Sequence, residues 1–164
     1  MYKRQLLTSA ADPEYIAPHC KKYEDYDRVM DAGASSKNIY FIRYADLILL
    51  YAECLLAEND LAGAKQQVIR VRNRAKVSTP ITASNNTEML DFIYEERMRE
   101  LGMEGWRRMD LIRRGADYFA AQVDKYNPFA KGNVQPYHAF YPIPTNEINM
   151  NDGIGAEDQN EGYK

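Results

Sequence analysis

The stretch that decides the fold runs from residue 41 to residue 75 and reads FIRYADLILLYAECLLAENDLAGAKQQVIRVRNRA. From Asn38 to about Asn59, apolar residues recur at three- and four-residue spacing, which predicts a helix of about five turns. The recurring positions are Phe41, Tyr44, Ala45, Ile48, Tyr51, Ala52 and Leu55. Three further leucines, Leu47, Leu49 and Leu50, extend the apolar surface nearly all round, so we expect this helix to be buried on most sides.

The second half of the stretch predicts another helix. Asp60 is placed to cap it, and its apolar stripe comprises Leu61, Ala64, Val68, Val71 and Ala75. Because the connection between the two helices is so short, they must run antiparallel as a hairpin. The hairpin resembles one tetratricopeptide unit, a helix pair that repeats about every 34 residues. We expect it to stack on further helices outside this chain.

Downstream, the chain predicts more helix and then a long irregular tail. Residues 84–87, Ser-Asn-Asn-Thr, offer N-caps for a third helix. Its expected face comprises Leu90, Ile93, Tyr94, Arg97, Met98 and Leu101. A continuation or restart is expected from Gly105 to Gly115, and a short helix from Ala116 to about Val123. From Tyr126 onward, prolines, glycines and asparagines predict an extended tail that packs across the helices.

The composition limits the class of protein to which this chain can belong. The 164 residues suffice for one domain with a sizeable core, and the apolar fraction of 45% is that of a globular protein. The net charge of −3 argues against a nucleic-acid binder, which would show a basic face. The two cysteines, Cys20 and Cys54, make no disulfide framework, and Cys54 lies in the first apolar pattern, where we expect it to be buried. Thirteen tyrosines suit half-wet surfaces and sugar contacts, although most are expected at the edges of a core.

The densest charge motif covers residues 96–115 and reads ERMRELGMEGWRRMDLIRRG. Glu96, Glu100 and Glu104 would line one face of a continuous helix. Paired carboxylates are what a glycoside hydrolase needs, but its general acid requires a raised pKa, and arginines crowd these carboxylates. We therefore interpret the motif as a structural ion-pair network, with Arg43 of the first helix as a further partner, and keep a carboxylate hydrolase as the less favoured reading.

Other catalytic signatures are missing from the sequence. The two histidines, His19 and His138, fit no zinc spacing, and the chain has no phosphate-binding loop and no nucleophile elbow. We expect no catalytic residue, no cofactor and no transition metal. Calcium held by tail residues such as Asn151, Asp152 and Asp158 is conceivable but has no supporting pattern.

Five aromatic residues are the candidate ligand contacts: Trp106, Tyr126, Phe129, Tyr137 and Phe140. Aromatic rings can stack on sugar rings, and residues in irregular segments more often carry function. Trp106 sits within the charge motif, where a packing anchor is the better interpretation. For the other four, core packing and ligand contact are equally good interpretations.

Three blocks of this sequence, in order, resemble the SusD/RagB family of nutrient-binding outer-membrane lipoproteins of Bacteroidetes. The first is IRYADLILLYAE at residues 42–53, with VRNRA following at residues 71–75. The second is the charge motif up to Arg113, which is similar to the family's E-R-x-x-E-L-x-x-E-G-x-R-x-x-D-L-x-R signature. The third is YPIPTNEI at residues 141–148, with NEGY at residues 160–163 closing the chain.

One position departs from the family pattern. Arg108 stands where the family usually has an aromatic residue, and we expect Trp106 to supply the missing bulk. On this resemblance, residues 38–164 are a SusD/RagB-like C-terminal region, and residues 1–37 are an irregular connection to a missing N-terminal part of the same protein.

The resemblance implies a mainly α fold, part of an α-superhelix with tetratricopeptide-like hairpins. It implies non-catalytic capture of a glycan or other nutrient at the outer membrane, delivered to a SusC-like TonB-dependent transporter. The intact protein would be lipid-anchored at the cell surface, whereas Cys20 follows Ala-Pro-His, which is no lipobox, so we expect the anchor to be absent from this chain. The alternative is a tetratricopeptide-like protein-interaction module.

The family's sugar contacts do not transfer by motif, so the matching residues are expected to be scaffold. These are Arg43, Asp46, Glu53, Glu96, Arg97, Glu100, Glu104, Gly105, Arg107 and Asp110.

Overall fold

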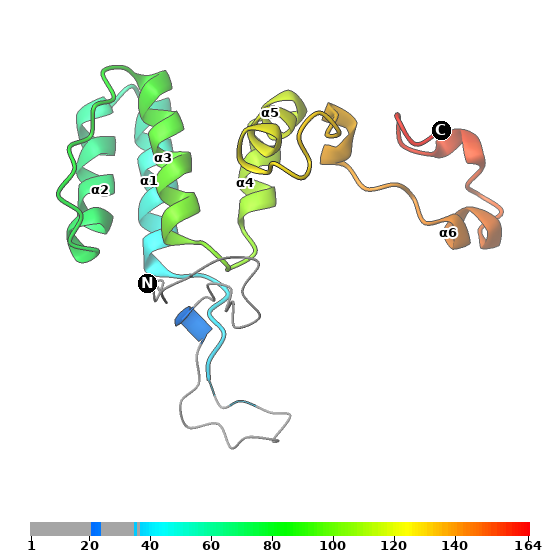
Figure 1. Ribbon diagram of the computed structural model, residues 1–164, viewed down its shortest axis with the longest axis horizontal. Helices are drawn as coiled ribbons and strands as arrows, with labels where there is room; N and C mark the ends of the chain where they lie inside the picture. Colours follow the sequence, from blue (N-terminus) through cyan, green and yellow to red (C-terminus); the bar gives the residue numbers. More distant parts are fainter. Residues whose placement is uncertain (1–20, 24–34, 36) are drawn as a thin grey trace, which may run out of the picture. The chain divides into compact units, whose positions relative to one another are not determined.

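The computed structural model describes residues 21–23, 35 and 37–164, and these residues form helices and connecting turns without a strand (Figure 1). The helices in chain order are η1 (Lys21–Tyr23), α1 (Tyr44–Ala57), α2 (Leu61–Arg74), α3 (Asn86–Glu100), α4 (Arg107–Arg113), α5 (Ala116–Tyr126), η2 (Pro136–Ala139), α6 (Thr145–Met150) and η3 (Ala156–Asp158). The predicted mainly α fold is confirmed. His19 and Cys20 lie outside the described residues, and the boundary at residue 37 stays a prediction.

The chain divides into two compact units, residues 1–78 and 79–164. In the first, α1 and α2 pack side by side as the predicted hairpin (Figure 1). Fully buried Leu49 and Ala52 of α1 and Ala64 and Val68 of α2 supply its core. The Asp60 carboxylate accepts a hydrogen bond of 2.8 Å from the Gly63 backbone N–H, so the predicted cap is confirmed.

Two expectations for the first helix are wrong. The helix begins at Tyr44 rather than near Asn38, and it is not buried on most sides, because α2 is the only α-helix among the described residues of its own unit that packs against it. A stripe of exposed side chains, Tyr44, Leu47 and Tyr51, runs along α1 at helical spacing. Cys54 is exposed as well, contrary to its expected burial. No helix in the described part of the chain combines the length and the apolar character needed to cross a bilayer.

The second unit begins with α3, whose predicted start is confirmed. The Asn85 side chain accepts a 3.0 Å hydrogen bond from the Glu88 backbone N–H. The helix ends at Glu100, so Glu96, Glu100 and Glu104 do not lie on one continuous helix, and the chain restarts as α4 at Arg107. The backbone breaks between the two helices because Met103 and Gly105 adopt positive φ angles of 65° and 85°.

A buried ion pair joins α3 to α4. Arg97 donates from Nε to Oδ2 of Asp110 and from a terminal nitrogen to Oδ1, each at 2.9 Å, and the two side chains are only 2% and 4% exposed. Arg113 adds a third contact to the same carboxylate at 3.1 Å. Two parallel hydrogen bonds between guanidinium and carboxylate fix both the distance and the angle between the two helices.

Beyond α4 the chain builds a second small core. Leu111, Phe119 and Ala139 are buried together, one each from α4, α5 and η2. Burial raises the pKa of Tyr118, which packs against this core, while the neighbouring Arg114 opposes the shift. The tail is irregular as predicted, except for three short helices, of which α6 begins where the Pro144 carbonyl accepts from the Glu147 and Ile148 backbone N–H groups.

The buried ion pair gives a first prediction. Asp110→Asn should destabilise the fold by about 3–5 kcal/mol, because it replaces the carboxylate that pairs with the buried Arg97 guanidinium by a neutral amide. The measurement is the free energy of unfolding from urea titration followed by circular dichroism. Glu95→Gln is the matched control, since it removes a carboxylate from an ion pair with Arg99 in which the side chains of Arg99 and Glu95 are 49% and 39% exposed. A loss below about 1 kcal/mol is expected there, and equal losses in the two variants would contradict a scaffold role for Asp110.

Candidate functional site

The candidate site is a hollow between η2 and the C-terminal turn, which we call the tail hollow. It encloses about 710 Å³, within the usual size range of small-ligand pockets. Its walls include Gln135, Tyr137, Phe140, Asn160, Glu161 and Gly162. Two segments that are distant in the sequence therefore line one cavity.

Side-chain to backbone hydrogen bonds hold the C-terminal turn against the segment that follows η2. The Tyr163 hydroxyl donates to the Phe140 carbonyl at 3.1 Å, and Asn160 Nδ2 donates to the Tyr141 carbonyl at 2.6 Å. The Gln159 amide pairs with both backbone groups of Ile143, accepting at 2.7 Å and donating at 2.9 Å. These bonds fix the second wall of the tail hollow relative to the first.

Gly162 makes the close approach of the two walls possible. Its φ is +87°, and a Cβ atom built on it would lie 2.3 Å from the Tyr137 ring, so no larger residue fits without displacing the ring. Tyr163 then meets the Tyr137 ring edge to face at 5.1 Å between centroids. The Tyr137 ring is thus held in one position by the turn.

Arg108 fixes the first wall from the α4 side. One terminal nitrogen donates to the His138 and Ala139 carbonyls at 3.0 Å each. Its guanidinium lies 4.2 Å from the Tyr141 ring centroid and 5.2 Å from that of Phe119. Arg108 thus links α4 to η2 and to the Tyr141 ring, and the expectation that Trp106 supplies bulk stays a prediction.

Of the five aromatic residues singled out in the sequence, the tail hollow brings together Tyr137 and Phe140. Trp106 is half-buried at the start of α4, Tyr126 is exposed at the end of α5, and Phe129 is 94% exposed in the following turn. Sequence reasoning did not single out the polar wall residues Gln135, Asn160 and Glu161. Asn160 lies in the quoted NEGY block at residues 160–163, and that block was the one signal in the sequence that could have pointed to it.

The tail hollow offers the groups that sugar binding needs. Phe140 is 60% exposed, so its ring is available to the apolar face of a sugar. The amides of Gln135 and Asn160 can each donate and accept, and the Glu161 carboxylate accepts, which suits the hydroxyl groups of a saccharide. This arrangement can bind and orient a ligand, and its described walls contain no nucleophile paired with a base.

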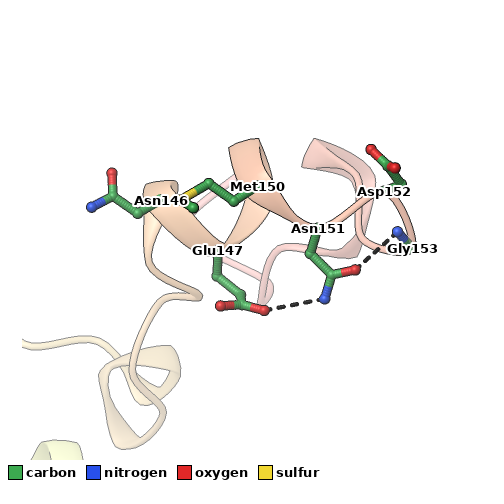
Figure 2. A pocket seen from close by; sticks show the side chains of 6 residues that line it. All are labelled: Asn146, Glu147, Met150, Asn151, Asp152 and Gly153. Carbon is green, nitrogen blue, oxygen red and sulfur yellow. Dashed lines mark hydrogen bonds between the residues drawn. The ribbon is translucent and has the colours of Figure 1, made fainter.

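A second hollow of about 550 Å³ surrounds the end of α6 (Figure 2). Asn151 bridges it, donating to Glu147 at 3.1 Å and accepting from the Gly153 backbone N–H at 3.0 Å. The described residues lining it include no aromatic side chain, so it is the poorer candidate for a sugar. Nowhere in the part of the chain that the structure describes do three or more histidine, cysteine or acidic side chains gather as metal ligands would.

Two carboxylates of the charge motif, Glu96 and Asp110, serve as ion-pair partners. Glu96 is buried and pairs with Arg99 at 3.0 Å, and Arg99 also pairs with Glu95 at 2.9 Å. Arg107 donates to the Tyr94 carbonyl at 3.1 Å. Of the other scaffold candidates, Asp46 is buried in α1, and Arg43 caps the same helix through its carbonyl, which accepts from the backbone N–H groups of Asp46 and Leu47.

Comparison with known proteins places these features in a family. Residues 4–163 match the model of the SusD family. The chain is 34% identical over 134 residues to the SusD-like protein P25 of Formosa agariphila, covering 79% of this chain and 25% of that protein. It is 32% identical over 142 residues to the starch-binding protein SusD of Bacteroides thetaiotaomicron, covering 83% of this chain and 23% of that protein.

The SusD-like protein P38 of Formosa agariphila is 34% identical over 84 residues, which cover 46% of this chain and 17% of that protein. The chain therefore spans about a quarter of the length of the first two of these relatives. No solved structure matches it significantly.

The position of Arg108 gives a second prediction. Arg108→Met keeps an unbranched, flexible side chain but loses both hydrogen bonds to η2 and the guanidinium contacts with the two rings. We expect faster hydrogen exchange at the backbone N–H groups of His138 and Phe140, and a loss of unfolding free energy of about 2 kcal/mol. Hydrogen exchange with mass spectrometry and urea unfolding measure the two effects.

Arg70→Met is the matched control for this prediction. Arg70 is an exposed arginine on α2 that bonds the Tyr44 hydroxyl at 3.1 Å and lies 5.9 Å from its ring. Its loss should leave exchange in η2 unchanged. Unaltered exchange at His138 and Phe140 in Arg108→Met would show that α4 does not position the tail hollow.

Proposed function

The chain belongs to the SusD family, and from this premise we propose that it is the glycan-binding part of a non-catalytic nutrient-capture protein at the bacterial outer membrane. The observation that carries the proposal is the tail hollow, in which aromatic rings and amide groups converge on one cavity of ligand size. The starch-binding relative supports a saccharide as the ligand class. On family resemblance, the intact protein would be lipid-anchored at the cell surface and would deliver its ligand to a SusC-like TonB-dependent transporter.

The non-catalytic part of the proposal rests on the charge motif. Its most buried carboxylates, Glu96 and Asp110, are both engaged in ion pairs: Glu96 pairs with Arg99 within α3, and Asp110 pairs with Arg97 across α3 and α4. A glycoside hydrolase would instead hold a carboxylate pair across an open cleft. We therefore propose binding without hydrolysis.

One observation favours the alternative, a tetratricopeptide-like module that binds another polypeptide. The exposed stripe of Tyr44, Leu47 and Tyr51 on α1 is the kind of surface that a helical groove presents to a partner. A module of that kind would be retarded by no polysaccharide. The experiment that tests glycan binding therefore also separates the two functions.

The third prediction tests glycan binding directly. Affinity electrophoresis in gels containing amylopectin, pullulan, laminarin or galactomannan should retard the chain with at least one of the four. Phe140→Ala should weaken the effective binding about tenfold, because it removes an exposed ring from the tail hollow without removing a backbone hydrogen bond. Isothermal titration with the retarding polysaccharide provides the affinity.

Phe129→Ala is the matched control, since Phe129 is exposed but does not line the tail hollow. It should bind like the original chain. Retardation that survives in Phe140→Ala would move the sugar site elsewhere. If no polysaccharide retards the chain, glycan binding by this part of the protein is refuted.

A further inference from the structure

The charge of the tail hollow defines the class of saccharide it takes, an inference that rests on the proposed function. Among the described residues that line it, Glu161 is the one charged side chain, and the other polar walls, Gln135 and Asn160, are neutral amides. A site for a uronate or a sulfated sugar would place a cation where the anionic group lies. We propose that the tail hollow selects uncharged saccharides and rejects anionic ones, and that Glu161 is the residue that sets this preference.

The segment around the hollow has the same sign of charge. Residues 133–164 carry five carboxylates and one lysine, Lys164. The five are Glu147, Asp152, Glu157, Asp158 and Glu161, and all are exposed. A polysaccharide reaching the tail hollow approaches through this field, which repels an anionic chain and leaves a neutral one unaffected.

The arginines of the second unit do not offset this field at the hollow. Those of α3, α4 and the α4 C-cap are Arg97, Arg99, Arg107, Arg108, Arg113 and Arg114, and each has an acidic or carbonyl partner within the fold. Arg108 contacts the hollow's first wall, but it donates to the His138 and Ala139 carbonyls and lies against the Tyr141 ring. Its charge therefore positions η2 rather than being presented to a ligand.

The role of Glu161 follows from its chemistry. An ionised carboxylate accepts hydrogen bonds from sugar hydroxyl groups and cannot donate to a second carboxylate or a sulfate. At a separation of about 4 Å in water, repulsion between two unit charges changes a binding constant about fivefold. Because exposed charges are screened within about 8 Å at physiological salt, the discrimination should be largest at low ionic strength.

The test compares polysaccharides that differ only at C6, where a primary hydroxyl group is replaced by a carboxylate. Each of amylopectin, pullulan, laminarin and galactomannan is paired with its own derivative oxidised to a carboxylate at C6, and binding is measured by isothermal titration at about 10 mM and about 150 mM salt. The original chain should bind the neutral member at least about fivefold tighter at low salt, with a smaller ratio at high salt. Glu161→Gln should reduce the low-salt ratio about fivefold while changing neutral binding little.

Asp152→Asn is the matched control, because Asp152 is an exposed carboxylate of the same segment that lines the other hollow (Figure 2). Its ratio should stay within about twofold of the original. Equal or tighter binding of the oxidised polysaccharides, or an unchanged ratio in Glu161→Gln, overturns the inference while glycan binding stands. Binding to none of the eight overturns both.

Discussion

The second unit depends on the buried ion pair between Arg97 and Asp110. Two full charges withdrawn from water are stabilising only when each satisfies the other, and the fork of two 2.9 Å hydrogen bonds does so. The pair ties α4 to α3, α4 packs on α5, and Arg108 of α4 bonds η2. The buried pair therefore holds α4, and α4 contacts both α5 and η2, whose residues line the tail hollow.

Local signals were sufficient for most of the helices. Asp60 and Asn85 each supply a side-chain oxygen to a backbone N–H three residues on, which depends on nothing distant. The start of α1 was missed because residues 39–42, Ile-Tyr-Phe-Ile, are apolar but exposed, and β-branched and aromatic residues form helix poorly without packing. The spacing of Glu96, Glu100 and Glu104 suits a continuous helix, and nothing in that spacing indicates the positive φ of Met103 beyond the end of α3.

Of the residues that line the tail hollow, only the two aromatic ones were among the candidates singled out in the sequence. Tyr137 and Phe140 attracted attention because they are aromatic residues in an irregular segment, where function is more often found than in the helices. Asn160 and Glu161 line the same cavity but lie about twenty positions further along the sequence than Tyr137 and Phe140. No periodicity in the sequence links residues so far apart. The structure explains the glycine at position 162, since its φ of +87° and its closeness to the Tyr137 ring leave no room for a side chain. This requirement comes from the tertiary contact between Gly162 and Tyr137, which the local sequence does not indicate.

The distribution of charge connects the scaffold to its binding preference. The arginines of the second unit lie in α3, α4 and the α4 C-cap, where carboxylates and backbone carbonyls bind them, and the tail that lines the hollow carries an excess of carboxylates. A guanidinium held by a buried carboxylate cannot also bind a ligand anion without losing the fold that positions the site. The same residues that make the scaffold rigid thereby remove the cations that an anionic saccharide would need, and this leaves aromatic faces and amides to do the binding.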